Sequence, residues 1–170
     1  MKFFATNLIF LDILLFSVLP LTAQRPQAIE PESELCRSAI ASVENQLKSD
    51  RNLTIELSQI ERLQYHPDHP EGRPNGYKVG MKGDAAFSVL GSPVLLNSLS
   101  TEIINNCNSV SLADFGIYQT GNVRTFGLMS NGEVEEFQCP ADYDDYPILG
   151  SDGQLQFYPR DLTWGESCAN

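Results

Sequence analysis

Basic residues and histidines are scarce in this chain of 170 residues. The chain has 11 lysines and arginines and 22 aspartates and glutamates, which gives a net charge of −11, and only two histidines are present. Because such a charge repels phosphate groups and anionic lipids, nucleic acid and acidic membranes are poor candidates for partners. No G-x-S-x-G motif is present, and both histidines fall in one loop, so a serine hydrolase is disfavoured. We assign no catalytic residue.

Long apolar segments are missing except at the N-terminus. Residues 1–23 combine a positive Lys2, an apolar run over 8–19 and a Leu-Thr-Ala ending, which is the pattern of a secretory signal peptide. Asp12 and Pro20 count against a stable membrane span. Two interpretations remain open: cleavage of the segment, which we favour, and its retention as an anchor. We therefore expect a secreted or periplasmic protein.

The chain after the signal has the length of one ordinary domain. Residues 24–30 form a polar, flexible lead-in, and residues 31–170 form the domain itself. Within the domain, residues 140–170 make an acidic tail that contains aromatic residues. Because this tail has too few apolar residues to fold alone, we expect a disulfide to tether it to the rest of the domain.

Two amphipathic helices are predicted. The first begins near Pro31 and runs toward Arg51, with its apolar residues on one stripe. The second begins at Ser92-Pro93, where a capping hydroxyl precedes a proline at the first helical position, and it ends near Asn106. Each helix carries one cysteine on its buried stripe.

Strands are predicted where apolar and polar residues alternate. Residues 52–65 alternate as a strand does, although they also fit a helix, and residues 77–82 alternate more clearly. Residues 110–117, 123–129 and 134–139 form a meander of three strands, because an Asn-Gly turn joins the last two. The expected fold is therefore α+β, with two helices on one face of an antiparallel sheet.

Four cysteines are present, and after export this even number indicates disulfides rather than catalytic thiols. Three pairings are possible, and the sequence does not decide among them. If the two helices lie antiparallel, Cys36 at the start of the first meets Cys107 at the end of the second, and Cys139 then pairs with Cys168. This pairing is our working hypothesis.

Five motifs follow one another in a specific order over most of the chain. They are RPNGY at 73–77, GSPVLLNSLSTEIINNC at 91–107, VSLADFGIYQTGN at 110–122, TFGLMSNGEVEEFQC at 125–139 and WGESC at 164–168. Together they resemble a family of small secreted proteins that is common in cyanobacteria. The resemblance implies export and one compact domain, and it transfers no activity, ligand or site residue.

His66 and His69 form the only histidine cluster, with Asp68 between them. Two imidazoles near a carboxylate can chelate a transition metal such as zinc. Prolines stiffen this loop, however, and no third ligand is identifiable nearby in the sequence. A solvated polar loop is therefore the preferred interpretation.

The acidic tail offers two further candidate sites. Asp142, Asp144 and Asp145 could bind calcium, but their spacing does not match an EF-hand, and a solvated acidic loop is preferred. The aromatic residues of the tail could form a recognition surface or could cover the sheet, and packing is the preferred interpretation. These aromatic residues are Tyr143, Tyr146, Tyr158 and Trp164.

We therefore expect an exported, non-enzymatic binding or interaction module, with an unknown extracytoplasmic ligand or protein partner and no bound cofactor. The first alternative is a metal-dependent enzyme or carrier that uses His66 and His69. The second is a calcium-stabilised adhesive module that uses the acidic tail.

Overall fold

The described part of the chain contains both helices and strands. The computed structural model describes residues 33–49, 51–64, 66–140, 148–149, 155–156 and 162–168. The elements are α1 (Glu34–Lys48), β1 (Thr54–Arg62), β2 (Asn75–Lys82), α2 (Ala86–Leu90), α3 (Pro93–Asn106), β3 (Val110–Ile117), β4 (Val123–Leu128), β5 (Val134–Glu136), β6 (Ile148–Leu149) and β7 (Leu155–Gln156). The expected signal segment, the lead-in and most of the acidic tail lie outside the described residues.

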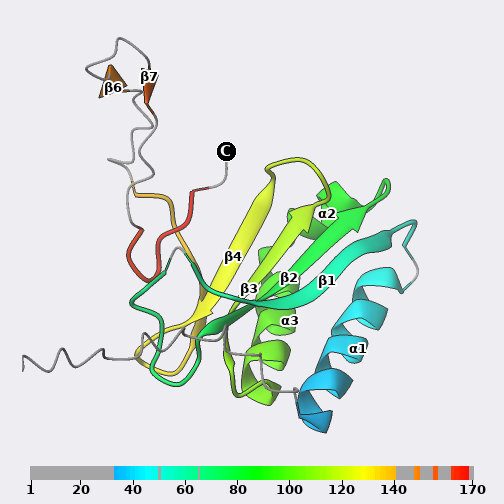
Figure 1. Cartoon of the computed structure of the whole chain (residues 1–170). Coiled ribbons are helices and arrows are strands. Elements are labelled where there is room, and N and C mark those ends of the chain that lie inside the picture. Colours follow the sequence, from blue (N-terminus) through cyan, green and yellow to red (C-terminus); the bar gives the residue numbers. More distant parts are fainter. Residues whose placement is uncertain are drawn as a thin grey trace, which may run out of the picture. The chain divides into compact units, whose positions relative to one another are not determined.

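Strands β1 to β5 form one mixed sheet in their sequence order (Figure 1). Strands β3, β4 and β5 pair antiparallel and make the expected meander, and β1 pairs antiparallel with β2. The prediction of a purely antiparallel sheet is wrong, because β2 and β3 run parallel. The reason is the connection between them: α2 and α3 carry the chain back along the sheet, so that β3 starts at the same end as β2.

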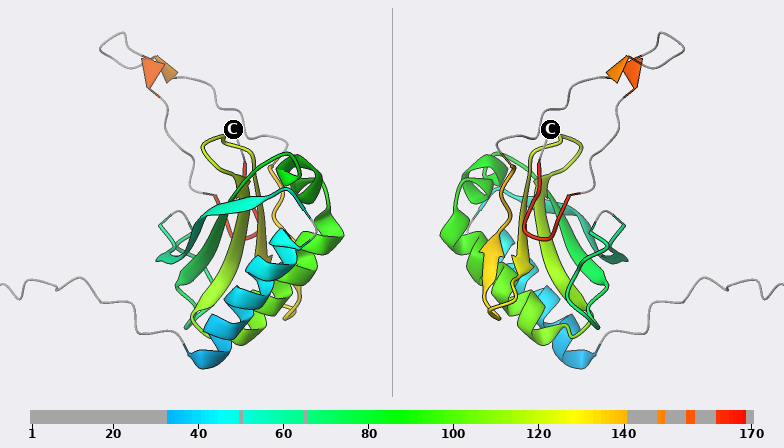
Figure 2. Two further views of the ribbon diagram at one scale, coloured as in Figure 1. Left: turned by 90° about the vertical axis from the view of Figure 1, so that its right-hand side faces the viewer. Right: turned by 90° about the vertical axis from the view of Figure 1, so that its left-hand side faces the viewer.

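Helices α1 and α3 cover the same face of the sheet and run antiparallel (Figure 2). Helix α1 starts at Ser33, whose side chain accepts a hydrogen bond from the backbone N–H of Cys36 at 3.2 Å. Helix α3 starts at Pro93 as expected, but the Ser92 hydroxyl does not cap it and instead donates to the carbonyl of Ser88. Among the described helices, none has the length and hydrophobicity needed to cross a bilayer.

The hydrophobic core lies between these helices and the sheet. Tyr77, Phe115 and Phe126 point from three neighbouring strands toward the helices and are fully buried. Phe115 and Phe126 meet edge to face, with their ring centroids 6.3 Å apart. Since each such side chain contributes about 1.5–3 kcal/mol on burial, this packing contributes substantially to the stability of the protein.

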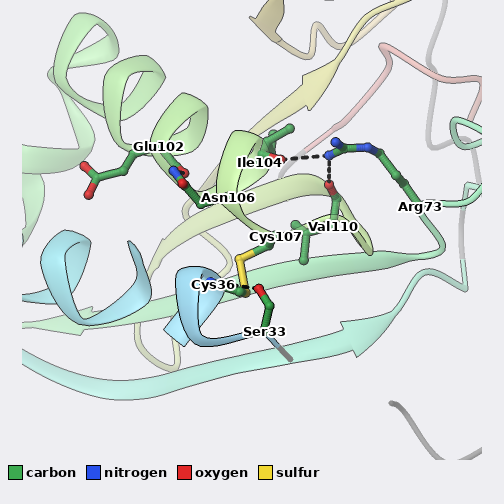
Figure 3. Close-up of a disulfide and its surroundings, with 8 residues drawn as sticks. All are labelled: Ser33, Cys36, Arg73, Glu102, Ile104, Asn106, Cys107 and Val110. Carbon is green, nitrogen blue, oxygen red and sulfur yellow. Dashed lines mark hydrogen bonds between the residues drawn. A yellow bond between two sulfur atoms is a disulfide. The ribbon is translucent and has the colours of Figure 1, made fainter. Parts of the chain in front are cut away.

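Two disulfides join distant parts of the fold. Cys36 at the start of α1 bonds to Cys107 at the end of α3 (Figure 3), and both cysteines are fully buried. Cys139, just after β5, bonds to Cys168 near the C-terminus. This is the pairing that follows from antiparallel helices, and the two bonds are consistent with an oxidising compartment.

The carboxyl end of α3 is closed by the side chain of Arg73 (Figure 3). Its Nη1 donates to the carbonyl oxygens of Ile104 and Val110, each at 2.8 Å. The last carbonyls of a helix have no partner within the helix. Arg73 therefore satisfies one of them and at the same time fixes the helix to the first residue of β3.

Arg73→Met is expected to lower the free energy of unfolding by about 2–3 kcal/mol, because two part-buried carbonyls lose a charged donor. Arg73→Lys should lose less, since an ammonium group can still reach one carbonyl. Urea unfolding followed by circular dichroism measures both values. Equal stability of Arg73→Met and the wild type would show that the contact is incidental.

The opposite face of the sheet, which we call the outer face, is covered by two chain segments. Residues 63–64 and 66–74 pass over one part of it, where the Leu63 side chain lies against Gly76. Residues 162–168 pass over another part, and the Gln138 N–H donates to the carbonyl of Gly165 at 2.9 Å. The Cys139–Cys168 disulfide holds this second segment in place.

Candidate functional site

His66 lies in an aromatic cluster on the outer face, together with Phe137 and Trp164. Its ring centroid is 5.6 Å from that of Phe137 and 5.7 Å from that of Trp164, and each pair meets edge to face. The Trp164 indole N–H donates to the carbonyl of Leu128, and its backbone N–H donates to Asp68 Oδ2. Trp164 therefore packs the C-terminal segment onto the sheet.

The surroundings of His66 favour a neutral imidazole. Burial lowers its pKa from the usual 6.5, and the negative charge of Asp68 opposes this shift. The side chain is only 8% exposed, and its Nδ1 has no hydrogen-bond partner among the described residues. His69 lies elsewhere in the loop, with its Nδ1 3.0 Å from the carbonyl of Pro70. Within the described part of the chain, no three metal-ligating side chains come together.

We expect His66 to make stability depend on pH. The unfolded state binds a proton near pH 6.5, whereas the folded state binds it only at lower pH, so the wild type loses stability as pH falls from about 7 toward the folded pKa. His66→Phe keeps the ring packing and should remove this loss. Denaturant unfolding at a series of pH values, read by Trp164 fluorescence, measures the slope.

His69→Gln is the matched control, and it should keep the pH dependence of the wild type. The prediction is contradicted when the wild type and His66→Phe show the same change in stability between about pH 7 and pH 5.

The other candidate residues of the tail are outside the described residues. These are Tyr143, Tyr146 and Tyr158, which were candidates for a recognition surface, and Asp142, Asp144 and Asp145, which were candidates for calcium binding. The two corresponding hypotheses stay predictions.

A hydroxyl relay connects the sheet to the C-terminal segment. Thr125 Oγ1 donates to Asp114 Oδ1 at 2.6 Å and lies 3.1 Å from Ser167 Oγ. Burial raises the pKa of Asp114, and the hydrogen bond from Thr125 partly offsets this. The Thr125 hydroxyl uses its one hydrogen in the bond to Asp114, so the Ser167 hydroxyl is the donor in the bond between Ser167 and Thr125. These two hydrogen bonds fix the segment that carries Trp164.

A pocket that is largely open to solvent, called the cavity below, lies between α2 and the start of β4, on the side of the sheet that the helices cover. Its volume is about 340 Å³, at the small end of the range for ligand sites. One wall comes from α2 and the residue after it, and the other from the β3–β4 turn and the first residues of β4. The lining residues are Phe87, Leu90, Gly91, Asn122, Val123 and Arg124.

Local hydrogen bonds shape both walls of the cavity. At the end of α2, the Gly91 N–H donates to the carbonyl of Phe87 at 2.9 Å. In the turn between β3 and β4, the Ile117 N–H donates to the carbonyl of Asn122 at 3.0 Å, and Gln119 takes a left-handed conformation with φ of 61°. The backbone on both sides of the cavity is therefore held by local hydrogen bonds.

Arg124 provides the only charge in the cavity lining. It pairs with Phe115 across the sheet, on the face that the helices cover, and its Nε lies 3.2 Å from Glu136 Oε1. Its Nη1 is buried and has no hydrogen-bond partner among the described residues. This nitrogen is shielded from solvent, so the cavity presents other, exposed parts of the Arg124 side chain to a ligand.

Apolar side chains flank the cavity and face solvent. Phe87 is 66% exposed and Val123 is 38% exposed, although both are large hydrophobic residues. Val94, close by in the sequence at the start of α3, is also strongly exposed. Apolar residues beside a few polar side chains, here Asn122 and Arg124, are typical of ligand sites and of the centres of protein interfaces.

Sequence reasoning did not find this site. One signal was present: Arg124, Phe126 and Leu128 alternate, which places a charge on the inward face of a strand whose other inward residues are apolar. No pattern indicated that α2 would stand next to β4, since that contact depends on the crossover between β2 and β3.

In comparisons with known proteins, no family model, no curated protein and no solved structure matches this chain. The function of the protein is therefore inferred from the geometry of the molecule.

Proposed function

We propose that this protein is an exported, non-enzymatic binding module whose ligand occupies the cavity between α2 and β4. The observation that carries the proposal is the pocket itself, which is lined by Arg124 and by apolar residues and is flanked by the exposed side chains of Phe87 and Val123. The signal-like residues 1–23, the two disulfides and the resemblance to a cyanobacterial family of secreted proteins support the extracytoplasmic setting.

The chemistry of the lining favours binding over catalysis. None of the lining residues is a histidine, a cysteine, a serine or a carboxylic acid. The cavity wall therefore offers hydrogen bonds and apolar contact, but no nucleophile and no general base. Glu136 is close, yet its carboxylate is already paired with Arg124, whose Nε lies 3.2 Å away.

A fragment screen by nitrogen-15 NMR tests the proposal on the disulfide-intact protein. We expect fragments to shift the amide signals of residues 87–91 and 122–124 together. Arg124→Met should weaken binding of those fragments at least tenfold, about 1.4 kcal/mol, because the lining loses its only charged side chain. Arg37→Met, a matched substitution on the exposed side of α1, should leave binding unchanged.

Two results would contradict the proposal. One is a screen in which no fragment shifts the cavity signals. The other is a set of fragments that bind Arg124→Met as tightly as the wild type while that variant keeps its fold.

A further inference from the structure

We infer that the Cys139–Cys168 disulfide is a redox switch, which a dithiol reductant opens in the folded protein to release residues 162–168 from the outer face. We call residues 162–168 the strap. The inference is independent of the ligand cavity, which lies on the other side of the sheet. Three observations carry it: the accessibility of this disulfide, the contacts that hold the strap, and the aromatic side chains beneath it.

The two disulfides of the protein differ in their accessibility. Cys36 and Cys107 are both fully buried, whereas Cys139 is exposed and Cys168 is half-buried. A disulfide is reduced when a thiolate reaches one of its sulfur atoms, so the rate depends on access, and exposed disulfides are the labile ones. A reductant can therefore approach the Cys139–Cys168 bond in the folded protein, while burial protects the other bond.

The two bonds also differ in how much of the fold must open around them. Cys36–Cys107 joins α1 to α3, and both helices pack against the hydrophobic core. A reductant reaches this bond only when the helices separate, which requires unfolding of much of the domain. Cys139–Cys168 joins the residues after β5 to the strap alone, so a local opening of the strap is enough.

Besides the disulfide, the strap is held mainly by hydrogen bonds and by one large side chain. The Gln138 N–H donates to the Gly165 carbonyl at 2.9 Å, and the Ser167 N–H donates to the Gln138 carbonyl at 3.2 Å. Trp164 adds the two hydrogen bonds described above, and Ser167 adds its contact with Thr125. When the strap moves away, water replaces these partners and the strap gains conformational freedom, so we expect the reduced strap to open.

The strap covers aromatic side chains of the outer face. Trp164 lies over Gly127, where a Cβ atom would be 3.1 Å from Cζ2 of the indole. Its ring also meets the rings of Phe137 and His66, which are both buried. Release of the strap would expose these two rings together with the backbone N–H and carbonyl of Gln138. The oxidised protein thus hides an apolar part of the outer face that the reduced protein presents.

The exchange balances with a dithiol as the co-reactant. One thiolate of the reductant attacks the Cys139 sulfur, the S–S bond breaks, and Cys168 leaves as a thiolate that takes up a proton. The second thiolate of the reductant then attacks the reductant's own sulfur in the mixed disulfide, and Cys139 leaves as a thiolate and is protonated. Two electrons and two protons pass from the dithiol to the protein, and the reductant becomes a disulfide.

Dithiothreitol, a small neutral dithiol, tests the switch on the disulfide-intact protein. Samples of the reaction are quenched with excess iodoacetamide at a series of times and analysed by peptide mass spectrometry. We expect Cys139 and Cys168 to be labelled at least about tenfold faster than Cys36 and Cys107. The emission of Trp164 should shift to longer wavelength over the same time course, while far-ultraviolet circular dichroism keeps the signal of the helices.

Hydrogen exchange locates the change in the protein. The amides of Gln138 and Ser167, which donate in the pairing between the strap and the sheet, should lose protection on reduction, and the amides of α1 should keep it. Removal of dithiothreitol and addition of oxidised glutathione should restore the protection and the Trp164 emission, because a switch is reversible.

Cys139→Ser/Cys168→Ser is the matched variant. It should show the emission of the reduced protein from the start, and dithiothreitol should not change that emission. A second arm replaces dithiothreitol by reduced thioredoxin at equal concentration. Faster reduction by thioredoxin would assign the co-reactant to a protein dithiol, and slower reduction would assign it to a small dithiol.

Two results would overturn the inference. One is labelling of all four cysteines at the same rate, which would mean that reduction follows unfolding of the whole domain. The other is reduction of Cys139–Cys168 with no change in Trp164 emission or in the exchange of the Gln138 and Ser167 amides, which would mean that the strap stays in place. Neither result bears on the proposed ligand cavity, because fragment binding there is measured on the oxidised protein.

Discussion

Replacing both Cys36 and Cys107 by alanine is expected to lower the free energy of unfolding by about 4 kcal/mol. The bond closes a loop with a sequence separation of 71 residues, so its loss restores a large conformational entropy to the unfolded chain. Marginal stability of 5–15 kcal/mol is usual for a domain, so the variant would lose a large share of its stability. Urea unfolding of the purified variant measures the change.

Hydrogen exchange shows where the stability is lost. Because this disulfide joins the start of α1 to the end of α3, amides of these two helices should lose protection first. Replacing Cys139 and Cys168 instead should release residues 162–168 and leave α1 protected. A loss below about 1 kcal/mol in the first variant would contradict the role that we give to this bond.

Gly127→Ala is expected to destabilise the protein by about 2–4 kcal/mol. A methyl group at this position would overlap two ring carbons of Phe137 and lie 3.1 Å from Cζ2 of Trp164. The Phe137 ring is buried and packs against both His66 and Trp164, so it has little room to move. Trp164 is the only tryptophan of the chain, and its fluorescence should shift to longer wavelength as the cluster opens.

A second substitution tests the cause of this loss. In the double variant Gly127→Ala/Phe137→Leu, the smaller side chain should relieve the overlap and recover at least about 1 kcal/mol. Gly72→Asn is the control, since no atom lies near that glycine and asparagine tolerates its positive φ. Unchanged fluorescence and stability in Gly127→Ala would show that the cluster does not close over this glycine.

Local patterns in the sequence predicted the elements of the fold well. The apolar stripe that contains Cys36 marked α1, the Ser92-Pro93 pair marked the start of α3, and the Asn-Gly turn marked the hairpin of β4 and β5. Residues 52–65 fitted a strand or a helix, and their pairing with β2 makes them the strand β1. The disulfide pairing was a working hypothesis that depended on the two helices lying antiparallel, and the structure contains both bonds.

The direction of strand pairing and the cavity depended on contacts between distant residues. Alternation shows which side chains share a face, but it is the same for parallel and antiparallel neighbours, so β2 and β3 were assigned the wrong direction. The helix-containing crossover that makes them parallel also brings Phe87 beside Arg124. His66 was conspicuous as a possible ligand in the sequence, and the structure instead buries it among aromatic rings.

The most direct test of the proposed ligand site is a crystal structure of the disulfide-intact protein soaked with a fragment that shifts the amide signals of residues 87–91 and 122–124. We predict that the fragment occupies the cavity between α2 and β4, with its apolar part against Phe87 and Leu90. Binding of the fragment at another surface, with this cavity empty, would contradict the account.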